Sequence, residues 1–206
     1  MVSTVASSPK ILFPMMIKLA GRKCVVVGAG KVAAAKIKGL LTCGAKVVVV
    51  APEAVRRIRT WASRSKVVWQ RRRFSPRDLR GVFLAIAATD SPSTHESVFR
   101  SCRAQNVLCN VVDDPEHCDF FYPAVVRRGA LQIAISTGGS SPALAARIRR
   151  ELSRQFGSEW APFVRRLAAE RKKLLQLPPS AQRQQLVKHL STLLPSSPAG
   201  QSGSLK

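Results

Sequence analysis

The chain has 206 residues and carries 34 Lys and Arg against 11 Asp and Glu, which gives a net charge of +23. With 46% hydrophobic residues it is typical of a globular protein of one large domain or two small ones. No stretch approaches the ~20 apolar residues of a membrane helix, which excludes a helical membrane protein. The charge indicates an anionic partner, either a nucleic acid or a polycarboxylate or phosphate ligand.

The cysteines and the N-terminus predict the compartment. The five cysteines are odd in number and include no C-x-x-C pair, so we expect reduced thiols and not a disulfide framework. Lys10, Pro14 and Lys18 interrupt the mildly apolar N-terminus, which argues against a signal peptide. The sequence therefore predicts a soluble, cytoplasmic protein.

Strands and helices alternate through the first half of the chain. Short β-branched and apolar runs predict strands at 23–27, 46–50, 66–69, 81–89 and 107–112. Helical patterns fill the connections, one after the first strand and two more at 53–64 and 91–106. Continuously apolar strands that alternate with helices predict the α/β class. We expect a Rossmann-type, doubly wound parallel sheet over residues 12–113.

The pattern changes after residue 113. Residues 119–137 resemble two strands around the turn "RRGA", which predicts a β-hairpin in a segment at 114–140. A C-terminal helical domain at 141–195 follows, with helices predicted at 142–157, 158–177 and 180–194. Ser141 is the expected N-cap of the first of these helices, as Ser91 is for the helix at 91–106. The Ser- and Pro-rich stretch at 196–206 predicts a disordered tail.

A glycine turn lies between the first strand and its helix. The stretch "VVVGAGKVA" places Gly28, Gly30 and Ala33 in a G-x-G-x-x-A arrangement. In a βαβ unit, the first glycine allows the tight turn and the second lets the backbone approach a pyrophosphate. Ala33 permits close packing of helix on strand. The helix N-terminus then offers amides to the phosphates, so we favour a dinucleotide site over a glycine turn without a ligand.

Glu53 is the candidate for the acid that binds the ribose. It follows the second strand at about the distance, ~20 residues, at which a dinucleotide-binding fold places this acid. Glu53 either reaches the ribose or opens the helix at 53–64, and both readings stay open. Because no Arg lies at the end of this strand, the sequence predicts NAD in preference to NADP.

Four of the eleven acids lie within "DDPEHCD" at 113–119. The spacing matches no zinc pattern, and the adjacent His117 and Cys118 would point apart on an extended strand, so we expect no structural metal. We expect His95 and His189 to be ordinary surface residues.

Asp113 has two readings from the residues alone. It is either a turn residue or a general base at the carboxyl end of a strand. Neighbouring Asp114 and Glu116 would then raise its pKa by like-charge repulsion. Together with Asp119 they either adjust Asp113 in this way or offset nearby arginines.

The chain resembles the family of precorrin-2 dehydrogenase, which is also the N-terminal module of siroheme synthase. The matching stretches are "VVVGAGKVAAAKIKGLLTCGAKVVVVAPE", "LAIAATD" and "NVVDDPEHCDFFYPAVVRRGALQIAISTGGSSPALAARIRREL". They fall within residues 12–175. The order of "AATD", "NVVD", F-x-x-P and "STGGSSPALA" makes the resemblance specific.

The resemblance implies oxidation of precorrin-2 to sirohydrochlorin with NAD⁺, by a homodimer that forms through the hairpin segment. It implies that Asp113 is the catalytic residue. The implied cofactor set is Gly28, Ala29, Gly30, Lys31, Val32, Ala33, Glu53, Thr89 and Asp90. The implied substrate set, for the carboxylates of the tetrapyrrole, is Thr137, Gly138, Gly139, Ser140, Ser141, Arg127, Arg128 and Arg147, with Arg149 and Arg150 as further candidates. Thr137 stands where the family often has a serine and keeps its hydroxyl.

Two other functions stay open. Some members of the family also insert Fe²⁺, which would make the chain a bifunctional dehydrogenase and ferrochelatase. In another class, the chain would be an NAD(H)-sensing module that binds nucleic acid through its basic helices at 142–175. The sequence has no helix-turn-helix pattern and no interleaved aromatic residues for base stacking, so we expect no nucleic-acid partner.

Overall fold

A computed structural model describes residues 11–193, which fall into two compact units at 11–121 and 122–193. The disordered tail predicted at 196–206 lies outside the described residues.

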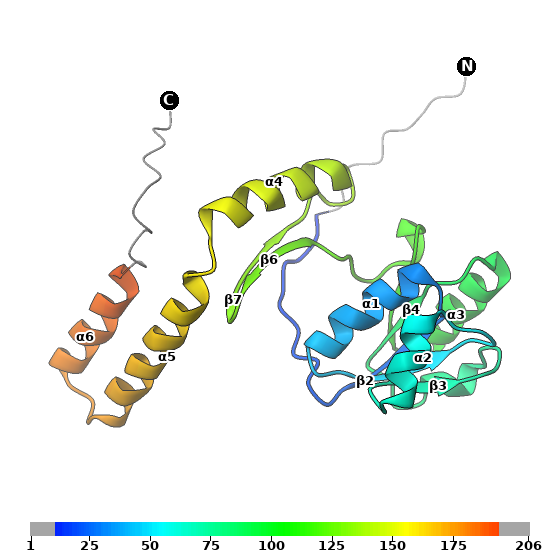
Figure 1. Ribbon diagram of the computed structural model, residues 1–206, viewed down its shortest axis with the longest axis horizontal. Coiled ribbons are helices and arrows are strands. Elements are labelled where there is room, and N and C mark those ends of the chain that lie inside the picture. The colour runs from blue at the N-terminus through cyan, green and yellow to red at the C-terminus, as the bar shows by residue number, and fades with distance from the viewer. Residues whose placement is uncertain (1–10, 194–206) are drawn as a thin grey trace, which may run out of the picture. The chain divides into compact units, whose positions relative to one another are not determined.

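The first unit is a five-stranded parallel sheet with helices on both faces (Figure 1). The strands are β1 (Lys23–Val27), β2 (Lys46–Val50), β3 (Val68–Gln70), β4 (Leu84–Ala87) and β5 (Leu108–Val111). The helices are α1 (Lys31–Thr42), α2 (Arg56–Ser63) and α3 (Pro92–Ala104), and 3₁₀ turns lie at Pro76–Leu79 and Pro115–His117. The strand order β3-β2-β1-β4-β5 is that of a doubly wound fold, so the predicted α/β class is confirmed.

Successive residues of each strand point to opposite faces of the sheet and pack in two separate cores. Val26 of β1 packs in the core that includes Ile37 of α1. Its neighbour Val25 points the other way, into the core that includes Val98 of α3. All four side chains are fully buried. Because helices cover both faces, the strands need apolar residues at every position, which explains their continuously apolar sequences.

Two boundaries differ from the prediction for identifiable reasons. The helix predicted at 53–64 begins at Arg56, because the amide of Val55 donates to the carbonyl of Ala29 (3.0 Å) and holds Val55, with an extended backbone, beside the glycine turn. The strand predicted at 81–89 is only Leu84–Ala87, since a turn precedes it, in which the amide of Val82 bonds the carbonyl of Leu79 (3.1 Å).

The segment after β5 stays with the sheet. The amide of Asp119 donates to the carbonyl of Cys109 on β5 (2.8 Å), and the amide of Cys109 donates to the Asp119 carboxylate (2.9 Å). Residues 114–121 are held to the edge of the sheet in this way. The first unit therefore ends at residue 121 and not at the predicted 113.

The second unit contains a hairpin followed by three helices. Strands β6 (Ala124–Arg128) and β7 (Leu131–Ile135) pair antiparallel, and α4 (Pro142–Gln155), α5 (Trp160–Gln176) and α6 (Ala181–Thr192) follow. The Ser141 hydroxyl accepts a hydrogen bond from the amide of Leu144 (3.3 Å), as its predicted role of N-cap requires. The predicted hairpin and helices are confirmed, with the hairpin strands shorter than 119–137.

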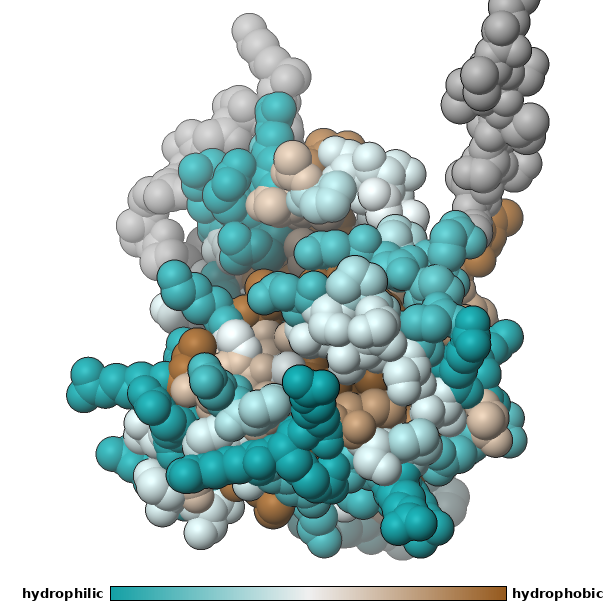
Figure 2. All heavy atoms as spheres, turned by 90° about the vertical axis from the view of Figure 1, so that its right-hand side faces the viewer, coloured by the Kyte–Doolittle hydropathy of each residue, from teal (hydrophilic) through white to brown (hydrophobic). Residues whose placement is uncertain are grey.

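Much of the basic surface is solvated. Figure 2 shows one face of the molecule, on which hydrophilic side chains project between small apolar patches. Some arginines lie over aromatic rings and cover apolar surface with their stems, as Arg22 does over Phe83 (4.2 Å) and Arg71 over Trp69 (4.4 Å). Within residues 11–193, no helix has both the length and the apolar character needed to cross a membrane.

Candidate functional site

A cleft opens at the carboxyl ends of the parallel strands, within the first unit. It has a volume of about 1070 Å³, and its walls come from the segments that follow all five strands. The order of the strands places the glycine turn after β1 at the centre. The segments after β2 and β3 lie on one side of it, and those after β4 and β5 lie on the other. Open α/β sheets bind their ligands at such a switch point.

Gly28 makes the turn that the sequence predicted. Its φ is +101°, a conformation that residues with a Cβ rarely adopt. A Cβ at this position would lie 2.0 Å from the carbonyl oxygen of Ala88, directly after β4. Only glycine therefore fits between the first strand and its neighbour.

Gly30 opens the phosphate end of the cleft. It is the N-cap of α1, and a Cβ built there would meet no atom within 4 Å, so its surroundings are open. The first turn of α1 holds no acidic side chain. The first amides of a helix have no partner within the helix, and they attract an anion. This geometry fits the pyrophosphate of a dinucleotide.

Most of the predicted cofactor residues line this one cleft: Gly28, Ala29, Gly30, Lys31, Val32, Glu53, Thr89, Asp90. Ala33 instead is fully buried in the core, which agrees with its predicted packing role. Glu53 lies in a bend before α2 and does not open the helix, so that reading of Glu53 is wrong. Its place on the cleft wall is compatible with a contact to the ribose.

His95 is a cleft residue that the sequence did not reveal. It belongs to the first turns of α3 and is half-buried on the cleft wall, so the expectation of an ordinary surface residue is wrong. Its Nε2 is buried and has no hydrogen-bond partner among the described residues. Buried polar atoms are normally satisfied, so this nitrogen fits a bound polar ligand. The exposed His189 of α6 is a surface residue, as predicted.

Asp113 lines the same cleft on the side of β5. The amide of Asp114 donates to the carbonyl of Val111 (3.3 Å), which closes a turn with Asp113 inside it. Asp113 adopts a φ of +60°, a left-handed conformation that Asp tolerates better than most residues. The turn reading and the site reading of Asp113 are therefore compatible, because the turn is what holds the exposed carboxylate at the strand end.

Lys36 of α1 also acts on this turn. Burial lowers the pKa of its ammonium group, and the charges of Cys118 and Asp113 act in the opposite direction. Helix α1 therefore brings a basic group within electrostatic reach of Asp113.

The other acids of the 113–119 stretch have structural partners. The Asp114 carboxylate contacts Nδ1 of His117 at 2.5 Å, and Glu96 of α3 lies 3.8 Å from Nε2 of the same ring. The Asp119 carboxylate bonds β5 and also pairs with Arg103 (3.3 Å). Asp114 and Asp119 therefore offset basic groups, and their contacts hold the segment beside β5.

The Asp114–His117 pair predicts a pH-dependent contribution to stability. The hydrogen bond that His117 donates to the Asp114 carboxylate raises the pKa of His117 above 6.5, and the same bond lowers the pKa of Asp114 below 3.8. The histidine contribution is complete below its unfolded pKa and is lost as pH rises through the folded pKa. The aspartate contribution is lost only as pH falls below 3.8.

We therefore expect His117→Gln to lower the urea midpoint of unfolding more at pH 5.5 than at pH 9. The effect is modest, since the pair is partly exposed. An equal loss at the two pH values would contradict the assignment of the charged pair.

The predicted substrate loop lies in the second unit, between β7 and α4. The Thr137 hydroxyl accepts from the amide of Ser141 (3.0 Å), and the Thr137 carbonyl accepts from the amide of Ser140 (3.0 Å). Gly138 and Gly139 adopt φ values of +62° and +88° between them. The loop is thus a compact turn on the N-terminus of α4, where an anion is favoured.

The arginines proposed for the substrate differ in their availability. The Arg128 guanidinium donates to the carbonyls of Phe156 (2.7 Å) and Ser153 (2.9 Å), at the C-terminus of α4. Cations are favoured at that end of a helix, so these bonds hold Arg128 against the end of α4, while its contact with the substrate stays a prediction. Arg127 and Arg147 are exposed and make only surface contacts, with Gln132 and Glu151.

No group of three or more His, Cys, Asp or Glu within residues 11–193 is arranged to hold a metal ion.

The fold and the cleft define a class of protein, the doubly wound α/β proteins with a dinucleotide-binding glycine turn at the switch point. Comparison with known families agrees with this class. The family model "Putative NAD(P)-binding" matches residues 15–124, more than half of the chain, and the model "Sirohaem biosynthesis protein central" matches residues 128–155. The chain belongs to this family of putative NAD(P)-binding proteins.

The individual proteins similar to this chain include siroheme synthases and a precorrin-2 dehydrogenase. Siroheme synthase of Nitrosococcus oceani is 40% identical over 139 residues, which cover 68% of this chain and 30% of that protein. Siroheme synthase of Xylella fastidiosa is 37% identical over 161 residues, with 78% and 34% covered. The chain thus spans about a third of the length of these relatives. The solved structure of SirC, precorrin-2 dehydrogenase, matches with a TM-score of 0.74 and 29% identity, over 87% of this chain and 89% of that one.

Proposed function

We propose that the chain is an NAD-dependent precorrin-2 dehydrogenase, which oxidises precorrin-2 to sirohydrochlorin. The observation that carries the proposal is that Asp113 and the glycine turn line a single cleft. The similarity to SirC along most of both chains supports the substrate, and the names of the siroheme synthases support the pathway.

The proposed roles of the cleft residues differ according to the strand that each residue follows. The amides of the first turn of α1 and Gly30 would hold the pyrophosphate, and Glu53 would accept hydrogen bonds from ribose hydroxyls. Thr89 and Asp90, which follow β4, would contact the other half of the cofactor. Bound NAD⁺ supplies a hydride acceptor. Asp113 accepts the proton that the substrate loses as its hydride departs.

The residues predicted to bind the substrate carboxylates belong to the second unit. Arg127 and Arg147 are exposed, and each can exchange its surface partner, Gln132 or Glu151, for paired hydrogen bonds with a carboxylate. Arg149 and Arg150 are further candidates. The turn of residues 137–141 offers the hydroxyls of Thr137, Ser140 and Ser141 at the start of α4, while the amides of Ser140 and Ser141 bond within the turn. An anionic tetrapyrrole also suits a chain with a net charge of +23.

An anaerobic assay tests the proposal. We expect the purified chain to form NADH from NAD⁺ and precorrin-2, followed by absorbance at 340 nm, with sirohydrochlorin appearing in equal amount. NADH formation no faster than in the protein-free control would overturn the proposal.

Assembly and iron insertion are two further parts of the proposal. We infer that the chain works as a homodimer through the hairpin segment at 114–140, which light scattering of the purified protein tests: a monomeric mass would contradict it. Iron insertion is tested with Fe²⁺ and sirohydrochlorin under anaerobic conditions. Siroheme formation faster than the uncatalysed rate would make Fe²⁺ the substrate of a second reaction.

The five free thiols support a reducing, cytoplasmic setting.

A further inference from the structure

Arg73 lies on the cleft wall, on the side where the proposed dinucleotide site would hold the adenosine half of the cofactor. It follows β3, and Glu53 follows the neighbouring β2. Both lie on the opposite side of the glycine turn from Asp113. The sequence predicted a third strand at 66–69 and did not indicate that Arg73 lines the cleft. In the structure this strand is Val68–Gln70, and the residues after it reach the cleft.

An ion pair between the buried Asp78 and the exposed Arg72 holds the backbone at Arg73 in place. The Asp78 carboxylate is only 8% exposed and accepts two hydrogen bonds from Arg72 (2.5 and 2.9 Å) and one from the amide of Ser75 (2.9 Å). The same Arg72 guanidinium donates to the carbonyl oxygen of Arg73 (3.1 Å). Burial opposes the charge of Asp78, but the hydrogen bonds from Arg72 and Ser75 hold its pKa below the usual value. The pair is therefore ionised at neutral pH.

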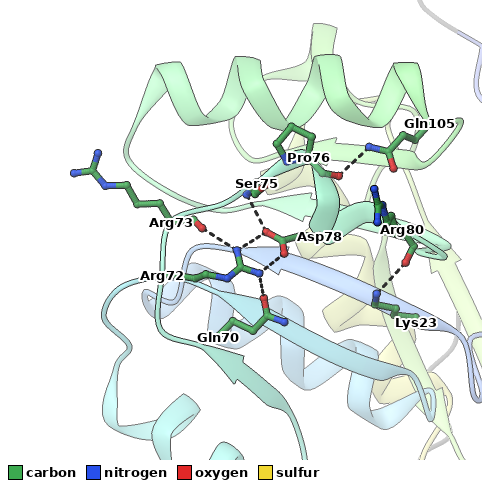
Figure 3. Close-up of polar contacts among 9 residues, drawn as sticks. All are labelled: Lys23, Gln70, Arg72, Arg73, Ser75, Pro76, Asp78, Arg80 and Gln105. Carbon is green, nitrogen blue, oxygen red and sulfur yellow. Dashed lines mark hydrogen bonds and ion pairs between the residues drawn. The ribbon is translucent and has the colours of Figure 1, made fainter.

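The Arg73 side chain is left available by this arrangement. Figure 3 shows it extending away from the Arg72–Asp78 pair, while its carbonyl turns toward that pair. Arg73 is exposed, and within residues 11–193 neither it nor Glu53 makes an ion pair. The cleft thus presents one anchored cation and one carboxylate at its adenosine end.

These two groups recognise different forms of the adenosine ribose. A free 2′-hydroxyl donates to a carboxylate, whereas a 2′-phosphate is repelled by it and pairs with an arginine through charge-assisted hydrogen bonds. We propose that Arg73 is a 2′-phosphate contact, through which the cleft binds NADP⁺ as well as NAD⁺. The inference rests on the proposed dinucleotide site and extends it to a second cofactor.

Titration calorimetry with NAD⁺ and NADP⁺ on the full chain tests this inference. We expect the wild type to bind both, and Arg73→Ala to weaken NADP⁺ about 10- to 100-fold while NAD⁺ changes by less than about twofold. Arg73→Lys keeps the charge without the two-pronged geometry and should lie between. Glu53→Gln should change the two affinities in opposite directions, weaker for NAD⁺ and tighter for NADP⁺.

Arg71→Ala is the matched control. It removes the same charge from the same segment, but Arg71 lies over the Trp69 ring and does not line the cleft, so both affinities should stay near wild type. Equal losses of NADP⁺ affinity in the two variants would reduce the effect to general charge and overturn the inference. So would a wild type that binds NAD⁺ but not NADP⁺. A wild type that binds neither would count against the dinucleotide site itself.

Discussion

Asp113→Asn is expected to lower the turnover of precorrin-2 by about 10²- to 10⁴-fold, the usual contribution of a general base. The amide cannot accept the departing proton, yet it keeps the size of the side chain. Asn also tolerates the left-handed backbone at this position, where φ is +60°. The dissociation constant of NAD⁺ should therefore change by less than about twofold. Stopped-flow measurement of NADH formation, with calorimetry for NAD⁺, gives both quantities.

Asp113→Ala should lose turnover to a similar extent and keep NAD⁺ binding. It is the less clean variant, because Ala in the left-handed region adds roughly 1 kcal/mol of strain. Asp114→Asn is the matched control, since this neighbouring carboxylate is held by His117 and does not line the cleft. If Asp113→Asn turns over at the wild-type rate, the site assignment is wrong.

Gly28→Ala is expected to cost about 3–5 kcal/mol of stability, a loss typical of severe strain and overpacking. The new Cβ would lie 2.0 Å from the carbonyl oxygen of Ala88 and 2.6 Å from its carbon. Neither atom belongs to a flexible side chain, so relief requires moving the backbone beside β1 and β4. We expect the variant to melt far below the wild type and to lose NAD⁺ binding.

Gly30→Ala separates folding from ligand binding at the same turn. Its Cβ would enter open space, and its φ of −80° suits any residue, so the melting temperature should hardly change. The methyl group would instead occupy space that the pyrophosphate needs, and NAD⁺ affinity should fall about tenfold or more. If Gly28→Ala melts within a few degrees of the wild type, the tight packing between the two strands does not hold.

Local sequence patterns predicted most of the fold. The apolar strands, the N-caps Ser91 and Ser141, and the spacing of Gly28 and Gly30 each act over a few residues, and each can be recognised without knowledge of distant partners. The element ends were less accurate where a distant hydrogen bond decides them. The amide of Val55 bonds Ala29, and this contact delays the start of α2.

The sequence by itself determined the class of the protein and the glycine turn, because strand, turn and helix are contiguous there. Only the tertiary structure decided which residues meet around that turn. Glu53, Arg73, His95 and Asp113 follow four different strands and reach one cleft because parallel strands bring their carboxyl ends to the same edge. Likewise, Arg128 is committed to the C-terminus of α4 by contacts with residues far along the chain, which no periodicity records.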